Sequence, residues 1–378
     1  MDKSSTISEN RFAIGILCLC AVTAACDYND PGEPAMVHDS FGLDMVVAIA
    51  LDSEDISAMR NSTYAKPKVR GKVWINDDGY FATISHCGAT SVDDYKKNYE
   101  LALDDAFEGR TIYRLSAMAS DDSAMRALLA YRTFRKLGVD MPELVPAAVW
   151  VNEEYAGLFM WQEKIDEEYF EKRDIIPISL YQAENGAAEM FDTSNIDEQF
   201  SAKIGSKEKA DLKHLIQTLT ADPADDTRMP LEQILNVDNV LEYMAAVAYI
   251  DASDGIRNNF YFVRTRDEPR FEILPWDLDR TFYKNYPIDN GVIFERNHMM
   301  TRFFYDLPAY REKYDRYYRE VAATVPAEDL ATYTDELVAL LREAFENDRY
   351  LSNKGKTLDE HAEALKAFFF SEKVTSIE

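Results

Sequence analysis

The stretch DASDGIRNNFYFVRTRDEPRFEILPWDLD, residues 251–279, holds the densest group of polar residues able to support chemistry in this chain. It predicts a loop, then a hairpin formed by Asn259 to Arg264 and Arg270 to Leu274, and then the acidic exit Trp276-Asp277-Leu278-Asp279. Paired carboxylates at a strand exit commonly hold a divalent metal through oxygen ligands. Each of these polar residues alone is more simply a turn or helix cap, so only their combined spacing indicates a site.

The spacing favours phosphoryl transfer. Asp254 and Asn259 stand five positions apart, the D-x-x-x-x-N interval of a protein-kinase catalytic loop, and Asp277 follows after the hairpin. In such a site a carboxylate orients the acceptor hydroxyl, while an Asn oxygen and an Asp carboxylate hold the metal that binds the phosphates. A metal-dependent glycosyltransferase is an alternative, because Asp277-Leu278-Asp279 is also an Asp-x-Asp motif after an apolar strand. That chemistry does not require the upstream loop.

With these motifs the chain resembles the CotH kinase family, named after spore coat protein H, whose members have an atypical protein-kinase fold. The matching segments are Asp254-Gly255 with Asn259 to Phe262, and Pro275 to Asp279. The resemblance implies ATP with Mg²⁺ or Mn²⁺ as cofactors and Asp254 as the catalytic aspartate. It implies Asn259 and Asp277 as metal ligands, with Asp279 supporting the metal site.

The resemblance extends upstream and implies the nucleotide-binding residues. A turn at Gly88 precedes the pair Lys96-Lys97, either of which would neutralise phosphates, although an exposed basic pair is the alternative for one of them. Gln162 and Glu163 would form the hinge beside adenine. The helix expected over Asp121 to Leu137 takes the place of the kinase helix αC, but it contains no Glu. An acidic partner for the lysine is therefore expected from Asp121, Asp122 or elsewhere.

Three positions depart from the family pattern. Cys87 stands where Arg is usual, Gln182 stands where Lys is common, and Tyr283 replaces a Gly. Cys87 is expected to be a half-buried small residue and not a nucleophile, because nothing near it in the sequence supplies a base and a group to orient that base. These departures weaken the prediction of ATP binding more than the prediction of the fold.

The order of elements predicts an α+β protein with an atypical bilobal protein-kinase-like fold. A sheet-rich N-lobe is expected over residues 41–166, a junction with an insertion over 167–230, and a mainly helical C-lobe carrying the catalytic hairpin over 231–378. Strands are expected at Met45 to Leu51, Lys72 to Ile75, Tyr80 to Ser85, Asn98 to Leu103, Ala147 to Asn152 and Gly157 to Trp161. Helices are expected at Asp121 to Leu137, from Glu167, near Lys207 to Leu219, and at Val240 to Ile250, Pro308 to Val325, Asp329 to Asn347 and Leu358 to Phe370.

The N-terminus predicts export. Residues 1–25 are typical of a signal peptide, because the apolar run Phe12 to Ala25 is shorter than the roughly 20 residues that span a bilayer. The run ends at Cys26, which resembles a bacterial lipoprotein acylation site, and residues 26–40 form a polar tether. Plain cleavage after Ala25 is the alternative. We therefore expect an extracytoplasmic protein, either lipid-anchored to a bacterial membrane or secreted.

Composition restricts the partners. The 378 residues are 47% hydrophobic, enough for a large core, and carry a net charge of −27, which disfavours nucleic acid as a partner. The expected partner is a protein with Ser or Thr acceptors, and the membrane is contacted only through the lipid anchor. A non-catalytic surface or adhesion protein on the same fold is the alternative, since ATP is scarce outside the cytoplasm. The sequence does not indicate an oligomeric state.

Overall fold

The computed structural model describes residues 38–61, 66–88, 94–184, 193–221, 225–252, 254–283, 288–289, 292–293 and 307–371. Its strands are β1 (Met45–Ala50), β2 (Val69–Ile75), β3 (Asp78–Cys87), β4 (Asn98–Phe107), β5 (Arg110–Ser116), β6 (Leu144–Val151), β7 (Glu154–Glu163), β8 (Pro177–Ala183), β9 (Phe200–Ile204), β10 (Phe260–Thr265), β11 (Glu272–Pro275), β12 (Ile288–Asp289) and β13 (Val292–Ile293). Its α-helices are α1 (Ser53–Asn61), α2 (Arg126–Lys136), α3 (Glu167–Glu171), α4 (Ile196–Gln199), α5 (Ala210–Thr220), α6 (Asp225–Ile234), α7 (Val237–Tyr249), α8 (Asp254–Arg257), α10 (Pro308–Thr324), α11 (Ala327–Asn347) and α12 (Leu358–Phe369).

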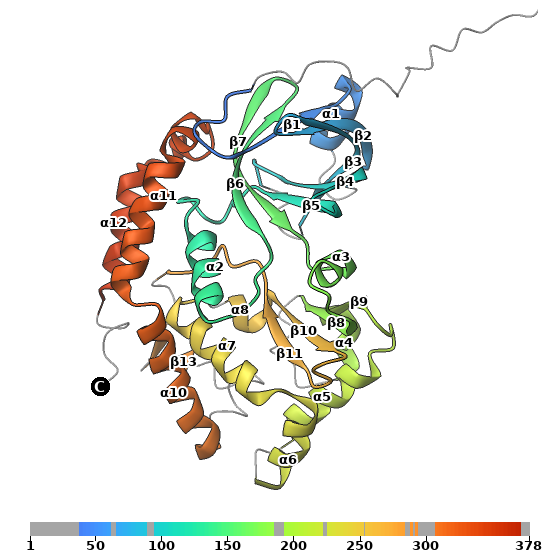
Figure 1. Ribbon diagram of the computed structural model, residues 1–378, viewed down its shortest axis with the longest axis vertical. Coiled ribbons are helices and arrows are strands. Elements are labelled where there is room, and N and C mark those ends of the chain that lie inside the picture. Colours follow the sequence, from blue (N-terminus) through green and yellow to red (C-terminus); the bar gives the residue numbers. More distant parts are fainter. Residues whose placement is uncertain are drawn as a thin grey trace, which may run out of the picture. The chain divides into compact units, whose positions relative to one another are not determined.

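Seven strands close into a barrel in the order β1-β2-β3-β4-β5-β7-β6 (Figure 1). Neighbouring strands pair antiparallel, except that β1 pairs in parallel with β6 and so completes the ring. Alternate side chains of each strand point inward, and the interior is filled by residues such as Val73, Leu101, Leu115 and Trp161. Closure leaves this sheet without an unpaired edge.

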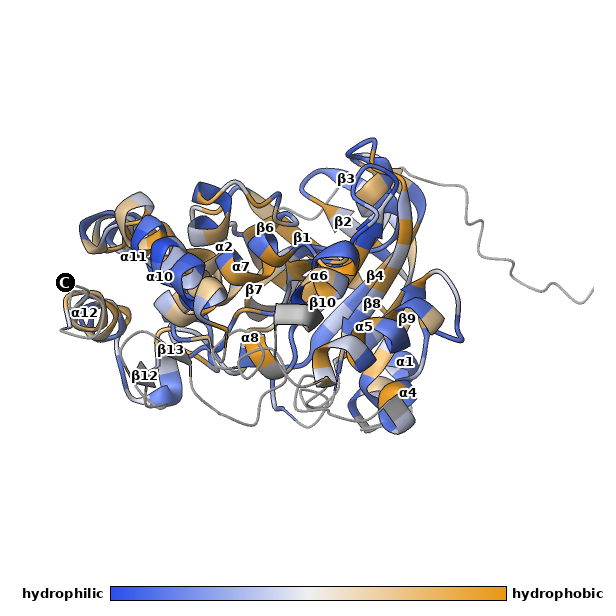
Figure 2. Cartoon of the chain, turned by 90° about the horizontal axis from the view of Figure 1, so that it is seen from below, coloured by the Kyte–Doolittle hydropathy of each residue, from blue (hydrophilic) through white to orange (hydrophobic). Residues whose placement is uncertain are grey.

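A second, four-stranded sheet has the order β11-β10-β8-β9, and helices pack around it. Helix α7 is buried along most of its length, α10 lies against it, and α11 and α12 form a helical hairpin (Figure 1). Figure 2 shows apolar residues on α7 and α8 and more hydrophilic surface on α10 and α11. One core of buried apolar residues joins α2 of the first half to α7, α11 and α12. No helix in the described parts of the chain is both long and apolar enough to cross a bilayer.

The α+β composition is confirmed, and the expectation of a plain bilobal arrangement is corrected by the closed barrel. Closure depends on pairing between β1 and β6, which are separated by about a hundred residues and leave no local signal. Five strands were not predicted, and two of them, β12 and β13, are only two residues long. In β5 the alternation is short, covering only Tyr113 to Leu115. β8 begins at a proline, and β9 lies in a stretch interpreted as polar and irregular.

The other predicted strands and helices are found, with small shifts at their ends. Helix α2 starts at Arg126 and not at Asp121, because the Asp121 carboxylate accepts hydrogen bonds from Ser123 N (3.0 Å) and Arg126 N (2.8 Å) and holds the intervening residues in a turn. The predicted signal peptide, Cys26 and residues 27–37 of the tether lie outside the described residues.

A buried ion pair connects the barrel to the end of α11. Lys96 Nζ lies 2.7 Å from Asp348 Oδ2, and the two side chains are 5% and 0% exposed. Lys96 also donates to the carbonyl of Leu158 in β7, and Asp348 accepts from the amides of Leu158 and Tyr350, each at 2.8 Å. Gly157 has φ +128°, and a Cβ at this position would lie 2.8 Å from Asp348 Cγ. Only glycine therefore leaves room for this contact.

The Gly157→Ala variant should be destabilised by roughly 3 kcal/mol, because the added methyl group meets a fully buried carboxylate and the backbone conformation is unfavourable for alanine. Gly109→Ala is the matched control. Gly109 also has a positive φ, +80°, but nothing lies within 4 Å of the position that an added Cβ would take. Denaturant unfolding should show a loss of only about 1 kcal/mol for the control. Equal losses in both variants would mean that the Asp348 contact does not matter.

Candidate active site

The hairpin β10–β11 brings Asn259 and Asp277 together. Phe260 pairs with Pro275, so Asn259 immediately precedes one strand and Asp277 closely follows the other. Trp276 N donates to Asn259 O (2.9 Å), and Asn259 Nδ2 donates to Asp277 O (3.1 Å). Both residues have left-handed backbone conformations, with φ of +58° and +55°. Such conformations are uncommon outside glycine and are concentrated at functional sites.

Asp277 and Asp279 flank the buried Leu278, and their carboxylates are close enough for the charge of Asp277 to act on Asp279. Within the described residues neither carboxylate has a hydrogen-bond or ion-pair partner. Loss of solvation raises the pKa of Asp279 well above its usual value, and the charges of Asp277 and Asp121 raise it further. Two unpartnered carboxylates that repel each other form a site that a cation would stabilise.

The donor set suits a hard divalent cation. The Asp277 and Asp279 carboxylates offer oxygens, and the Asn259 side chain uses its nitrogen on Asp277 O, which leaves Oδ1 as an acceptor. No group of three or more His, Cys, Asp or Glu side chains with metal-binding geometry occurs among the described residues. A site with few protein ligands matches Mg²⁺, which typically retains waters and takes further oxygens from substrate phosphates.

Arg114 on β5 is a buried cation that interacts electrostatically with these carboxylates. Burial opposes its ionisation, but the nearby charges of Asp277 and Asp279 raise its pKa. Its guanidinium also lies 5.8 Å from the centre of the Trp276 ring. Sequence reasoning missed Arg114 because β5 was not recognised as a strand. Its signal would have been the alternation of Arg114 with the apolar residues Tyr113 and Leu115.

Asp254 is bonded to residues that are the sequence neighbours of Asn259 and Asp279. It is the first residue of α8, and its carbonyl accepts from Asn258 N (2.8 Å), directly before Asn259. Its carboxylate pairs with Arg280 at 3.0 Å, and Arg280 follows Asp279 in the chain. Asp254 is therefore connected both to the residues that enter β10 and to the segment that follows β11.

Lys96, Lys97 and Glu163 lie elsewhere. Lys96 binds Asp348, which is the acidic partner expected from Asp121, Asp122 or another position, whereas Asp121 pairs with Arg126. Lys97 lines a cavity at the end of the barrel. None of the contacts found for these three side chains in the described parts of the chain involves Asp254, Asn259 or Asp277. Their assignment to nucleotide binding stays a prediction.

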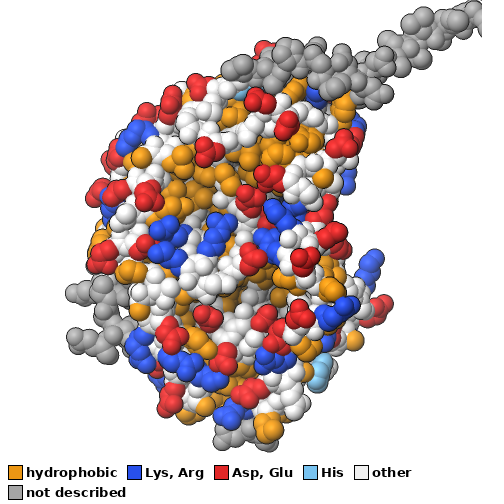
Figure 3. Space-filling view, in the orientation of Figure 1, with side chains coloured by type: hydrophobic (Ala, Val, Ile, Leu, Met, Phe, Trp, Pro, Cys, Tyr) orange, Lys and Arg blue, Asp and Glu red, His pale blue; other side chains and the backbone are white. Residues whose placement is uncertain are grey.

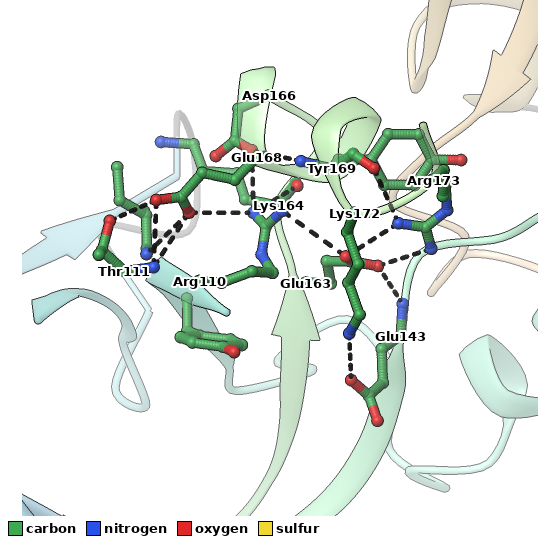
Figure 4. A network of polar contacts seen from close by, with 12 residues as sticks. Arg110, Thr111, Glu143, Glu163, Lys164, Asp166, Glu168, Tyr169, Lys172 and Arg173 are labelled. Atoms are coloured by element: carbon green, nitrogen blue, oxygen red, sulfur yellow. Dashed lines mark hydrogen bonds and ion pairs between the residues drawn. The ribbon is translucent and has the colours of Figure 1, made fainter. Parts of the chain in front are cut away.

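The Glu163 carboxylate is fully engaged in a polar network (Figure 4). Its oxygens accept from Arg173 Nη2 (2.9 Å) and from the backbone amide of Glu143 (3.0 Å), and Arg110 lies 3.6 Å away. These partners lower its pKa although burial acts in the opposite direction. Any contact with adenine at this position would therefore involve the neighbouring backbone or Gln162, whose Nε2 donates to Tyr131 Oη (2.9 Å).

The structure shows the surroundings of the three positions that depart from the family pattern, which are Tyr283, Gln182 and Cys87. Tyr283 donates to Ser120 O (2.7 Å), and the Arg126 guanidinium stacks 3.9 Å from its ring centre. Gln182 is part of β8 and pairs with Tyr261. Cys87 is half-buried and free, and burial raises the pKa of its thiol. A thiol held protonated agrees with the expectation that Cys87 is not a nucleophile.

The Asp279→Asn variant should be more stable than the wild type by about 1 kcal/mol near pH 7 without divalent metal. A raised carboxyl pKa means that the stability supplied by the neutral group is present below the unfolded pKa of 3.8 and is lost as the pH rises through the folded pKa. The gain should therefore disappear at about pH 3, where both chains are neutral at this position.

Thermal unfolding at both pH values measures this difference. Asp359→Asn is the control, because a hydrogen bond from Arg342 lowers the pKa of this exposed carboxyl, and its pH dependence has the opposite sign. A stability difference for Asp279→Asn that does not change with pH would contradict the proposed charge repulsion.

Comparisons with known proteins place this geometry in a family. The family model described as CotH kinase protein matches residues 84–372. Inner spore coat protein H of Bacillus subtilis (strain 168) is 23% identical over 240 residues, which are 61% of this chain and 66% of that protein, so the chain spans just under two thirds of this relative's length.

Two solved structures are similar at low scores. The Helicobacter pylori proinflammatory kinase CtkA is 10% identical, with a TM-score of 0.37 over 74% of this chain and 90% of its own. The Shewanella oneidensis MR-1 HipA, HipB and operator DNA complex gives 11% identity and a TM-score of 0.38 over 88% of this chain and 74% of the matched chain. The family match at residues 84–372 includes the whole hairpin with Asn259 and Asp277, and the chain belongs to the CotH kinase protein family.

Proposed function

We propose that the chain is an ATP- and divalent-metal-dependent protein kinase that phosphorylates Ser or Thr hydroxyls of an extracytoplasmic protein. Family membership supports the kinase class. The observation that carries the proposal is the pairing of Asn259 with Asp277 at the base of the β10–β11 hairpin, next to an unpartnered second carboxylate. A glycosyltransferase would need the Asp-x-Asp but not Asn259.

Each residue has a proposed role. Mg²⁺ or Mn²⁺ would supply charge neutralisation of the nucleotide phosphates, and Asn259, Asp277 and Asp279 would hold it. Asp254 would orient the acceptor hydroxyl and accept its proton. Arg114 would donate to phosphate oxygens, since the charges of Asp277 and Asp279 act on its buried guanidinium. Arg280 now occupies the Asp254 carboxylate, and an arriving hydroxyl would have to share that carboxylate with it.

The Asp254→Asn variant should keep its fold and its nucleotide affinity, because it removes a charge and little volume. Transfer of the γ-phosphoryl group should fall by about 10² to 10⁴, the usual effect of losing a positioned acid or base. Radiolabelled ATP with a mixed Ser/Thr protein acceptor measures transfer, and calorimetry measures nucleotide binding.

The Asp277→Ala variant should fail differently. Removal of this carboxylate should abolish metal-dependent ATP binding, while the fold is kept because no hydrogen bond to its side chain is lost among the described residues. Full transfer activity in both variants would contradict the assignment of the site.

A non-catalytic binding protein on the same fold is the second candidate. It is favoured by the state of Glu163, whose charge is satisfied by Arg173 and Arg110 and which therefore has no free carboxylate oxygen to offer a ligand. It would take the place of the kinase proposal if the wild type bound no ATP with either Mg²⁺ or Mn²⁺.

We also propose that the mature protein begins at Cys26 with attached acyl groups and lies outside the cytoplasm. Support comes from the apolar segment that ends in small residues before this cysteine, and from the name of the spore-coat relative. The intact mass of the native protein should lack residues 1–25 and include the acyl chains. A mass that retains residues 1–25 would contradict this prediction.

A further inference from the structure

A cavity of about 390 Å³ lies at one end of the barrel. Its walls come from α1, the segment before β4, the start of β7 and the residues that follow α11. Leu51, Met59 and Phe159 supply apolar surface. The volume lies within the range of small-molecule sites. Its lining residues include none of the carboxylates of the candidate active site, so the two sites are different.

Basic side chains collect in this cavity although the protein is strongly acidic. Elsewhere acidic and basic side chains are interspersed, as one face shows in Figure 3, and many form ion pairs. Arg60, Lys97 and Arg349 line the cavity, and none of them has an ion-pair partner among the described residues. Two carboxylates, Asp94 and Glu154, also line it.

The charges of the lining leave one cation in excess. Three cations face two carboxylates, and the further lysine, Lys96, is neutralised by Asp348. His86 also lines the cavity, and burial lowers the pKa of its imidazole, so it adds no charge at neutral pH. The lining therefore has the charge expected for binding a single negative group.

The rest of the lining suits a flat apolar body. Tyr99 and Phe159 have ring centres 6.1 Å apart inside the cavity, and Tyr350 lies beside Arg349. Tyr95 is 95% exposed although it lines the same cavity. Aromatic side chains give large contact area for little loss of entropy, and an exposed ring beside a cavity is available to cover a ligand.

We propose that this cavity binds a small organic monoanion: an aromatic or similarly flat apolar body among the rings, with its acidic group beside Lys97 and Arg349. Lys97 directly precedes β4 of the barrel, and Arg349 directly follows Asp348. The ligand would therefore contact both partners of the buried junction between the barrel and α11, and its binding would stabilise that junction. The cavity lining contains none of the carboxylates proposed for phosphoryl transfer.

The test uses the full mature chain and two matched probes, 2-naphthoate and its uncharged analogue 2-naphthamide, in titration calorimetry. Naphthoate should bind at one site and raise the midpoint of thermal unfolding, and naphthamide should bind at least about tenfold more weakly. The Lys97→Gln/Arg349→Gln variant should lose this preference for the anion. Its control is Lys68→Gln/Arg319→Gln, which removes the same two charges from exposed positions outside the cavity and should bind naphthoate as the wild type does.

Three results would overturn the proposal. They are no saturable binding of naphthoate, equal binding of the two probes, and equal loss of affinity in both double variants. Asp277→Ala should bind naphthoate normally even though it loses metal-dependent ATP binding. Loss of naphthoate binding in this variant would show that the probe enters the candidate active site and would contradict a separate cavity site. A failed kinase assay leaves the expected naphthoate results unchanged.

Discussion

The contact between Lys96 and Asp348 is the interaction on which the junction between the barrel and α11 depends. Removing two charges from water is costly, and their attraction compensates only where further hydrogen bonds complete both groups. Here Lys96 also donates a hydrogen bond to the Leu158 carbonyl. Asp348 accepts hydrogen bonds from backbone amides of β7 and of the turn after α11. The pair therefore holds together the segment before β4, strand β7 and the turn after α11. Leaving either charge alone would be far more costly than having neither.

In the candidate active site, by contrast, two charged groups lack hydrogen-bond partners among the described residues. Asp348 is surrounded by donors, whereas the carboxylates of Asp277 and Asp279 have none in the described parts of the chain. Burial, and after it the charge of Asp277, raises the pKa of Asp279. Such an arrangement lowers stability, and proteins accept this at sites where a ligand supplies the missing charge. The rigid hairpin makes it possible, because its pairing holds Asn259 and Asp277 in place without help from the carboxylates themselves.

The features that could be predicted from the sequence are those that depend on residues close together in the chain. Asn259 and Asp277 are brought together by a short hairpin with clear apolar strands, so their proximity could be inferred from the sequence. The partner of Lys96 could not be inferred, because Asp348 lies 252 residues away and no pattern relates the two positions. The closure of the barrel through β1 and β6 was missed for the same reason, whereas Arg114 was missed because β5 was not recognised as a strand. Long-range pairing is decided by packing, which local propensity does not encode.

The two adjacent lysines show how much the fold adds to a motif. Lys96 is buried and committed to Asp348, while Lys97 lies in the barrel-end cavity without an ion-pair partner among the described residues. If the proposed phosphoryl transfer occurs at Asp277, Arg114 supplies a buried positive charge that interacts with it. An arginine keeps its charge when buried and presents a planar fork to two phosphate oxygens, whereas a lysine in the same place would lose part of its ionisation to burial. A guanidinium from β5 is therefore better suited to a buried phosphate contact than an ammonium, while the assignment of Lys96 or Lys97 to the phosphates stays a prediction.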